Sequence, residues 1–240
     1  VYGVENLREI ILHFGIHTAD GDIQHSLIKT EPQNIADFSE IGNSVTSFDS
    51  VVGQEAAKRG LVIAASGLHN IALFGPPGTG KTMLARALQS ILPPLSYDEI
   101  LEVTEIHSVA GCLEHNIVTK PPVRSPHHTA SHTSLIGGGS TPKPGEITLA
   151  HRGVLFLDEF PEFNRNVIES LRQPLEDKVI SITRTKGVVT FPAHFILVAA
   201  LNPCPCGNRG IHGKTCVCAP LDIARYARKL SGPIVDRIDM

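Results

Sequence analysis

Residues 70–74 read NIALF and are followed by GPPGTGKT at 75–82, an apolar run that leads into a glycine-rich loop. The loop has the spacing G-x-x-x-x-G-K-S/T, and KTMLARALQSIL continues it with helical character. Between a buried strand and a helix, such a loop curls its backbone N–H groups around phosphates, and the helix dipole favours the negative charge. We therefore predict a nucleotide-binding P-loop formed by Gly75, Pro76, Pro77, Gly78, Thr79, Gly80, Lys81 and Thr82.

Two further apolar runs end in side chains that suit the same chemistry. VLFLDE at 154–159 ends in Asp158 and Glu159, and FILVAALN at 195–202 ends in Asn202. We predict that Lys81 binds the β- and γ-phosphates, that Thr82 and Asp158 hold Mg²⁺, and that Glu159 polarises the attacking water. Asn202 is predicted to hold that water or to sense the γ-phosphate. A helix N-cap for the acidic pair and a turn-forming Asn before Pro203 are the alternatives.

The order of the elements predicts an α/β fold. Apolar strands separated by helices indicate a parallel sheet covered on both faces. The expected elements are a helix to about residue 66, strands at 70–74, 153–159 and 195–202, helices at 81–92 and 164–177, and a β-hairpin of 179–185 and 187–193. The segment 111–150, rich in Pro, His and Gly, is too long for a simple connection.

The remaining segments set the domain organisation. Residues 1–14 have apolar positions at helical spacing and are expected to end an upstream domain, 15–46 to be a linker, and 47–240 to be the core. Because the chain begins at Val1 and stops within an apparent strand, we expect a piece of a longer protein. It has neither a membrane-length apolar run nor a leader, so a cytoplasmic location without a membrane partner is expected.

Four of the five cysteines form the pattern C-x-C-x9-C-x-C: Cys204, Cys206, Cys216 and Cys218. Four thiolates can enclose Zn²⁺ tetrahedrally and so fix a loop. The C-x-C spacing is tighter than the usual C-x2-C, and free thiols remain an alternative. Disulfides are disfavoured in a reducing cytosol. A structural zinc site is the favoured interpretation.

Several basic and imidazole side chains are candidates for contacts with partners. Arg237, in SGPIVDRID, is either part of a surface ion pair or an arginine finger for a neighbouring subunit. Lys143, Arg184 and Lys186 are candidates for DNA phosphates, although a solvated surface charge is the default for each. His127, His128 and His132 are expected to form hydrogen bonds or subunit contacts rather than a metal site. With a net charge of −3, nucleic acid would bind through local patches.

Beyond the P-loop, segments spread over residues 48–240 resemble the magnesium-chelatase-like family of AAA+ ATPases, of the ComM or YifB type. They are RSPHHTASHTSLIGGG at 124–139, PKPGEITLAHRGVLFLDEFPEF at 142–163, LRQPLED at 171–177 and LSGPIVDRID at 230–239. The RSPHH and KPGEI segments are more specific than the nucleotide motifs. Residues 1–14 resemble the end of the Lon-protease-like domain that precedes the ATPase in this family.

The resemblance implies a hexameric ATP hydrolase that uses ATP and Mg²⁺, with Arg237 completing the neighbour's site. It also implies that 111–150 is an insertion in the second helix, and that this insertion and the 179–193 hairpin project toward a central pore. The implied activity is a motor for DNA branch migration in natural transformation. The alternatives are the ATPase subunit of a magnesium chelatase and a protein-remodelling ATPase that binds no nucleic acid. The helical lid of the family lies beyond Met240, so no second sensor arginine is assigned.

Overall fold

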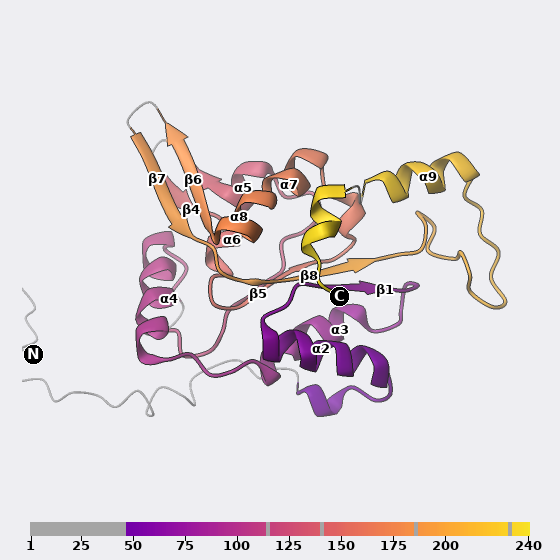
Figure 1. The fold of residues 1–240 in the computed structure, drawn as a ribbon, viewed down its shortest axis with the longest axis horizontal. Helices are drawn as coiled ribbons and strands as arrows, with labels where there is room; N and C mark the ends of the chain where they lie inside the picture. The colour runs from indigo at the N-terminus through magenta and orange to yellow at the C-terminus, as the bar shows by residue number, and fades with distance from the viewer. Residues whose placement is uncertain (1–46, 114–115, 140–141, 185–186, 230–231) are drawn as a thin grey trace, which may run out of the picture. The chain divides into compact units, whose positions relative to one another are not determined.

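The computed structural model describes residues 47–113, 116–139, 142–184, 187–229 and 232–240 (Figure 1). The helix predicted at 1–14, the linker at 15–46 and Lys186 lie outside these residues. None of the helices in the described part of the chain combines the length and the apolar character needed to cross a bilayer.

A parallel sheet forms the centre of the fold. Its strands are β1 (Ile71–Phe74), β8 (Ile196–Leu201), β5 (Val154–Leu157) and β2 (Val123–Arg124), and they are hydrogen-bonded in the order β1-β8-β5-β2. Every neighbouring pair is parallel. The three strands predicted from apolar runs are therefore confirmed, and β8 lies between the P-loop strand and the strand that precedes Asp158.

The central strands are buried on both faces, as their uninterrupted apolar sequences require. Alternate residues enter two separate cores because successive side chains point to opposite faces. In β5, Leu155 and Leu157 join one core, whereas Val154 and Phe156 join the other. The first core is covered by α5 (His132–Ile136), α6 (Glu146–Leu149), α7 (Arg165–Ser170) and α8 (Arg172–Asp177), and the second by α2 (Glu55–Gly67), α3 (Lys81–Ala87) and the 3-10 turns η2 (Phe48–Ser50) and η3 (Leu88–Ile91) (Figure 1).

The helix expected over 164–177 is two short helices. The first ends at Ser170, and the second begins at Arg172. Pro174 explains the break, because a proline has no N–H to donate and its ring clashes with the carbonyl group four residues earlier in a continuous helix. In the observed structure Pro174 lies in the first turn of α8, where its missing N–H costs nothing.

The 111–150 segment follows α4 (Tyr97–Ala110) and contains α5, α6, the edge strand β2 and a small antiparallel pair, β3 (Gly137–Gly138) with β4 (Lys143–Pro144). The predicted hairpin consists of β6 (Val179–Arg184) and β7 (Gly187–Pro192). Its strands pair from Val179–Pro192 to Arg184–Gly187. Figure 1 shows this hairpin projecting from the body of the domain.

Shorter elements follow β5 and β8, and the chain end returns to the sheet. After β5 comes the 3-10 turn η4 (Phe160–Glu162), and after β8 come α9 (Pro220–Arg228) and the 3-10 turn η5 (Gly232–Arg237). The chain end then runs along β1, where Ala72 N donates to Met240 O at 2.8 Å and Met240 N donates to Asn70 O at 3.2 Å.

Candidate nucleotide site

The P-loop has the backbone that phosphate binding requires. Gly78 and Gly80 have φ angles of +79° and +85°, in the left-handed region that favours glycine. A Cβ on Gly78 would have nothing within 4 Å, so this position of the loop faces open space. Gln54 helps to hold the loop, because its side-chain amide donates to Thr79 O at 3.3 Å.

Lys81 lies across the mouth of this loop. Its Nζ donates to the carbonyl groups of Gly75 at 2.7 Å and Pro76 at 2.9 Å, and to Asn202 Oδ1 at 3.1 Å. Burial lowers the pKa of Lys81, and the nearby Asp158 carboxylate opposes that shift. An ammonium group beside the loop amides suits a phosphate, so the Lys81 position predicted from sequence fits the observed geometry.

Thr82 and Asp158 form a second pair of groups at this edge. Thr82 Oγ1 donates to Asp158 Oδ2 at 2.7 Å, although 76 residues separate them. The backbone N–H of Glu159 donates to the other carboxylate oxygen of Asp158 at 2.9 Å. A hydroxyl and a carboxylate are hard oxygen ligands of the kind Mg²⁺ prefers, so these residues fit a nucleotide-bound magnesium ion.

Glu159 is held in an unusual conformation. Its φ angle is +51°, which is uncommon for a residue with a side chain, and the carboxylate is exposed. His128 Nδ1 lies 3.2 Å from Glu159 Oε2, and the His128 ring packs edge-on against Phe163. Strained backbone of this kind concentrates at functional sites. The contact brings the RSPHH segment to the predicted catalytic carboxylate, and sequence spacing alone could not have shown it.

Arg237 is separated from the P-loop of its own chain. Its carbonyl accepts from the side chain of Asn70 at 2.9 Å. Asn70 precedes β1, whereas the P-loop follows it and begins at Gly75, about 16 Å further along the strand. The Arg237 guanidinium pairs with Glu176 of α8 and donates to the carbonyl of Pro233. The structure thus brings Lys81, Thr82, Asp158, Glu159 and Asn202 to one edge of the sheet and leaves Arg237 elsewhere.

The four clustered cysteines converge in the loop after β8. Their sulfur atoms all lie within 4.8 Å of one another. Hydrogen bonds from the backbone N–H groups of Asn208 and Val217 lower the pKa of Cys206 to about 6. A hydrogen bond from the backbone N–H of Cys206 lowers the pKa of Cys218. Desolvation and the neighbouring sulfur atoms together outweigh this hydrogen bond and raise the pKa of Cys218 to about 12. Four cysteine sulfur atoms gathered this closely have the composition of a structural metal site.

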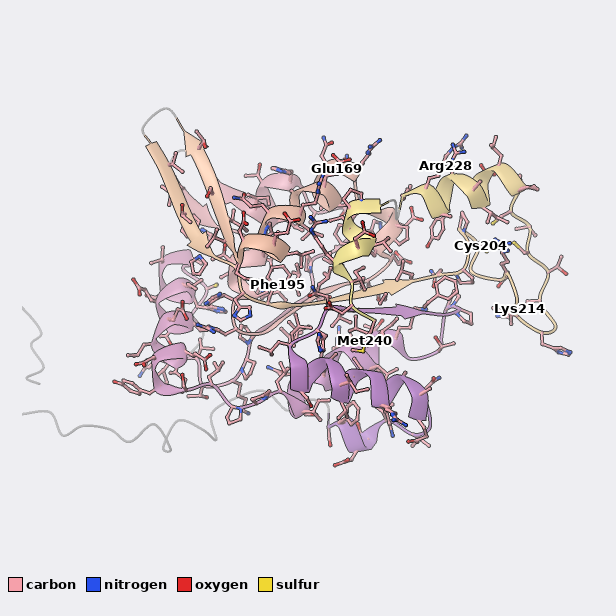
Figure 2. All side chains as sticks on the ribbon, viewed as in Figure 1. Glu169, Phe195, Cys204, Lys214, Arg228 and Met240 are labelled. Atoms are coloured by element: carbon pink, nitrogen blue, oxygen red, sulfur yellow. The ribbon has the colours of Figure 1, made fainter. Side chains whose placement is uncertain are left out.

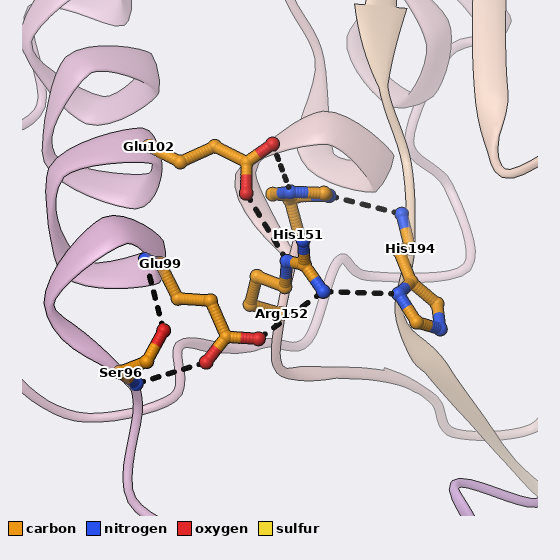
Figure 3. Close-up of polar contacts among 6 residues, drawn as sticks. All are labelled: Ser96, Glu99, Glu102, His151, Arg152 and His194. Carbon is orange, nitrogen blue, oxygen red and sulfur yellow. Dashed lines mark hydrogen bonds and ion pairs between the residues drawn. The ribbon is translucent and has the colours of Figure 1, made fainter.

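A polar cluster that sequence reasoning missed lies beside α4 (Figure 3). Arg152 binds Glu99 at 3.2 Å and Glu102 at 3.1 Å, and Glu102 also contacts His151 Nε2 at 3.1 Å. The backbone N–H of His194 donates to His151 Nδ1 at 3.0 Å, so the ring proton of neutral His151 resides on Nε2. Burial lowers the pKa of His151, in agreement with this neutral form.

This polar cluster joins segments that are far apart in the sequence. Glu99 and Glu102 belong to the helix that leads into the 111–150 segment, Arg152 follows that segment, and His194 follows the β6–β7 hairpin. Arg124 and Glu146 form a second brace inside the segment, with two contacts of 2.7 and 2.8 Å. The 111–150 segment and the β6–β7 hairpin are therefore held to one another where they join β5 and β8.

Comparison with known proteins places this geometry in a family. The family model described as magnesium chelatase, subunit ChlI, matches residues 47–240. The chain belongs to this family. YifB, an uncharacterized protein of Salmonella typhimurium, is 51% identical over 195 residues, which are 79% of this chain and 37% of that protein. The competence protein ComM of Haemophilus influenzae is 49% identical over 201 residues, which are 83% of this chain and 39% of that protein.

A solved complex of subunits BchI and BchD of magnesium chelatase shares the fold, with a TM-score of 0.55 and 21% identity over 82% of this chain and 70% of that chain. At this identity the likeness speaks for the fold alone. The resemblance to the ComM and YifB type of magnesium-chelatase-like AAA+ protein is confirmed. The chain spans only 37–39% of the length of these two curated relatives.

Proposed function

We propose that this chain is the ATP-hydrolysing core of an AAA+ ring motor. The observation that carries the proposal is the convergence of Lys81, the Thr82–Asp158 pair, Glu159 and Asn202 on one edge of the sheet. Lys81 and Thr82 begin α3, after the loop that follows β1, whereas the acidic pair follows β5 and Asn202 follows β8, which lies between β1 and β5. Membership of a family of AAA+ proteins supports ATP and Mg²⁺ as the nucleotide and the metal.

Each residue then has a distinct role in hydrolysis. The P-loop amides and Lys81 bind the phosphates, and Lys81 exchanges its contacts with loop carbonyls for phosphate oxygens. Thr82 and Asp158 hold Mg²⁺, which, when bound, neutralises charge that develops on the phosphate oxygens. Glu159 accepts a proton from the attacking water, and Asn202 orients that water beside Lys81.

Arg237 completes the site of a neighbouring subunit in this proposal. Its distance from the P-loop of its own chain supports an action in trans, and the pairing with Glu176 would be given up when a neighbour's γ-phosphate is presented. AAA+ assemblies that share sites in this way close into rings, and a hexamer is the assembly we propose.

DNA is the proposed substrate of the motor, with branch migration in transformation as its role. The relative ComM carries the name of a competence protein. The projecting β6–β7 hairpin and the exposed Lys143 of the insertion provide candidate contacts. The contacts of Arg152 and His194 fasten the 111–150 segment and the hairpin at their bases, so a force on either one reaches β5 and β8. Asp158 and Glu159 directly follow β5, and Asn202 directly follows β8.

The test is the ATP hydrolysis rate of the full-length protein with and without branched or single-stranded DNA. We expect DNA to stimulate hydrolysis, and Arg184→Ala with Lys186→Ala to remove the stimulation while preserving the basal rate. Lys58→Ala is the matched control, because Lys58 lies on α2 and forms an ion pair with Glu55 of the same helix. A rate that ignores DNA but responds to a partner protein would favour a chelatase-type or protein-remodelling ATPase.

We also propose Zn²⁺ as a structural ion bound by the four clustered cysteines. It takes no part in the hydrolytic step, because four thiolate ligands leave no open position for a substrate.

A further inference from the structure

The loop that carries the four cysteines rests directly on the P-loop. Residues 202–219, all of them described, form neither helix nor strand and begin at Asn202. Gly207 is buried, and a Cβ at this position would lie 2.5 Å from both Cδ and Cγ of Pro77. Figure 2 shows this loop, with Cys204 and Lys214 labelled, beyond the carboxyl ends of β1 and β8. The cysteine loop is thus an outer wall of the nucleotide site.

The spacing of the sulfur atoms fits a single tetrahedral metal ion. Cys204 Sγ lies 3.4 Å from Cys206 Sγ and 3.6 Å from Cys216 Sγ, and the latter two are 3.7 Å apart. Zinc–sulfur bonds of about 2.3 Å in a regular tetrahedron separate the sulfur atoms by about 3.8 Å, whereas a disulfide requires about 2.05 Å. A soft tetrathiolate set in this arrangement suits Zn²⁺.

The contacts that close the loop run through the cysteine sulfur atoms, such as the one from Cys206 N to Cys218 Sγ at 3.4 Å. Its backbone–backbone hydrogen bonds are local, such as Gly207 N to Cys204 O at 2.9 Å and Lys214 N to Ile211 O at 3.3 Å. Cys204 is fully buried, two residues after Asn202 and three before Gly207. The metal would therefore fix the short segment that joins Asn202, which contacts Lys81, to Gly207, which contacts Pro77.

We infer that Zn²⁺ on Cys204, Cys206, Cys216 and Cys218 positions the P-loop through Gly207, so that metal occupancy sets the affinity for nucleotide. This inference rests on the proposed nucleotide-binding function. Gly207 acts as a positioning residue: it touches the P-loop and not the phosphates. Any larger side chain there pushes on the Pro77 ring, which cannot yield by rotating as a flexible side chain would.

The experiment compares Gly207→Ala with Gly210→Ala in the full-length protein. The two glycines have nearly equal φ angles of +74° and +78°, but a Cβ on Gly210 meets nothing within 4 Å. Both variants therefore carry the same backbone strain, and only one presses on the P-loop. We expect Gly207→Ala to weaken binding of a fluorescent ATP analogue by about tenfold, because the added methyl group displaces the Pro77 ring and the P-loop with it. Gly210→Ala should bind like the unaltered protein, and both should retain one zinc per chain.

Metal analysis tests the other half of the inference. We expect one equivalent of zinc in protein purified without added metal, weaker binding of the analogue after chelation, and recovery when zinc is restored. Absence of zinc with all thiols titratable would overturn the metal site. Equal affinities of both glycine variants and the unaltered protein would overturn the coupling. If the unaltered protein fails to bind the analogue, the proposed function itself is wrong, whatever the zinc content.

Discussion

Glu159→Gln is expected to lower kcat for ATP hydrolysis by about 10²–10⁴-fold, the range attributed to a positioned general base. Glutamine has the same shape but cannot accept the proton of the attacking water. The Thr82–Asp158 contact and the Lys81 contacts do not involve the Glu159 side chain, so ATP affinity should change by less than about twofold. Steady-state hydrolysis and equilibrium binding of a fluorescent analogue measure the two quantities separately.

Glu162→Gln is the matched control for that experiment. Glu162 also follows β5 but contacts Lys229 at 3.4 Å, on the exposed surface. Its loss should leave hydrolysis nearly unchanged, because exposed ion pairs contribute little. If Glu159→Gln hydrolysed ATP at the normal rate, the base would have to be another group, and the left-handed conformation of Glu159 would have no catalytic meaning.

The sequence was sufficient to predict the elements that form the proposed phosphate site. Gly75, Lys81 and Thr82 are fixed by a local spacing, and three strongly apolar runs predicted β1, β5 and β8. The capping box of α4, in which Ser96 and Glu99 bond reciprocally to the backbone, was readable as S-x-x-E and would have predicted that helix. Local physics therefore accounts for these parts of the site.

The parts that were missed depend on distant contacts. Strand β2 has only two residues and follows Pro121 and Pro122, so it has no periodicity of its own and is defined by its pairing with β5. The contact between His128 and Glu159, and that between Arg152 and Glu102, join residues 31 and 50 positions apart. Such pairs follow from the order of strands and from packing, which no spacing rule encodes.

Arg237→Ala is expected to lower kcat by about 10³–10⁵-fold, the effect of an arginine finger on phosphoryl transfer. In the structure the guanidinium pairs with Glu176 of its own chain, so a structural role must be separated from a catalytic one. Glu176→Gln breaks the same pair while keeping the arginine, and it should hydrolyse ATP at least as fast as the unaltered protein. Loss of activity in both variants would assign Arg237 to the fold rather than to catalysis.

Mixing two inactive variants tests whether Arg237 acts on a neighbour. An Arg237→Ala subunit keeps Glu159, and a Glu159→Gln subunit keeps Arg237. When the Glu159→Gln subunit supplies its arginine to the site of the Arg237→Ala subunit, that site contains every catalytic group. Random assembly of equal amounts makes about a quarter of the interfaces complete, and activity should reappear on mixing. Mixing Arg237→Ala with the double variant Glu159→Gln, Arg237→Ala supplies no finger and should remain inactive. If the first mixture also stays inactive although mixed rings form, Arg237 does not complete the neighbouring site, and the separation between Arg237 and its own P-loop has another cause.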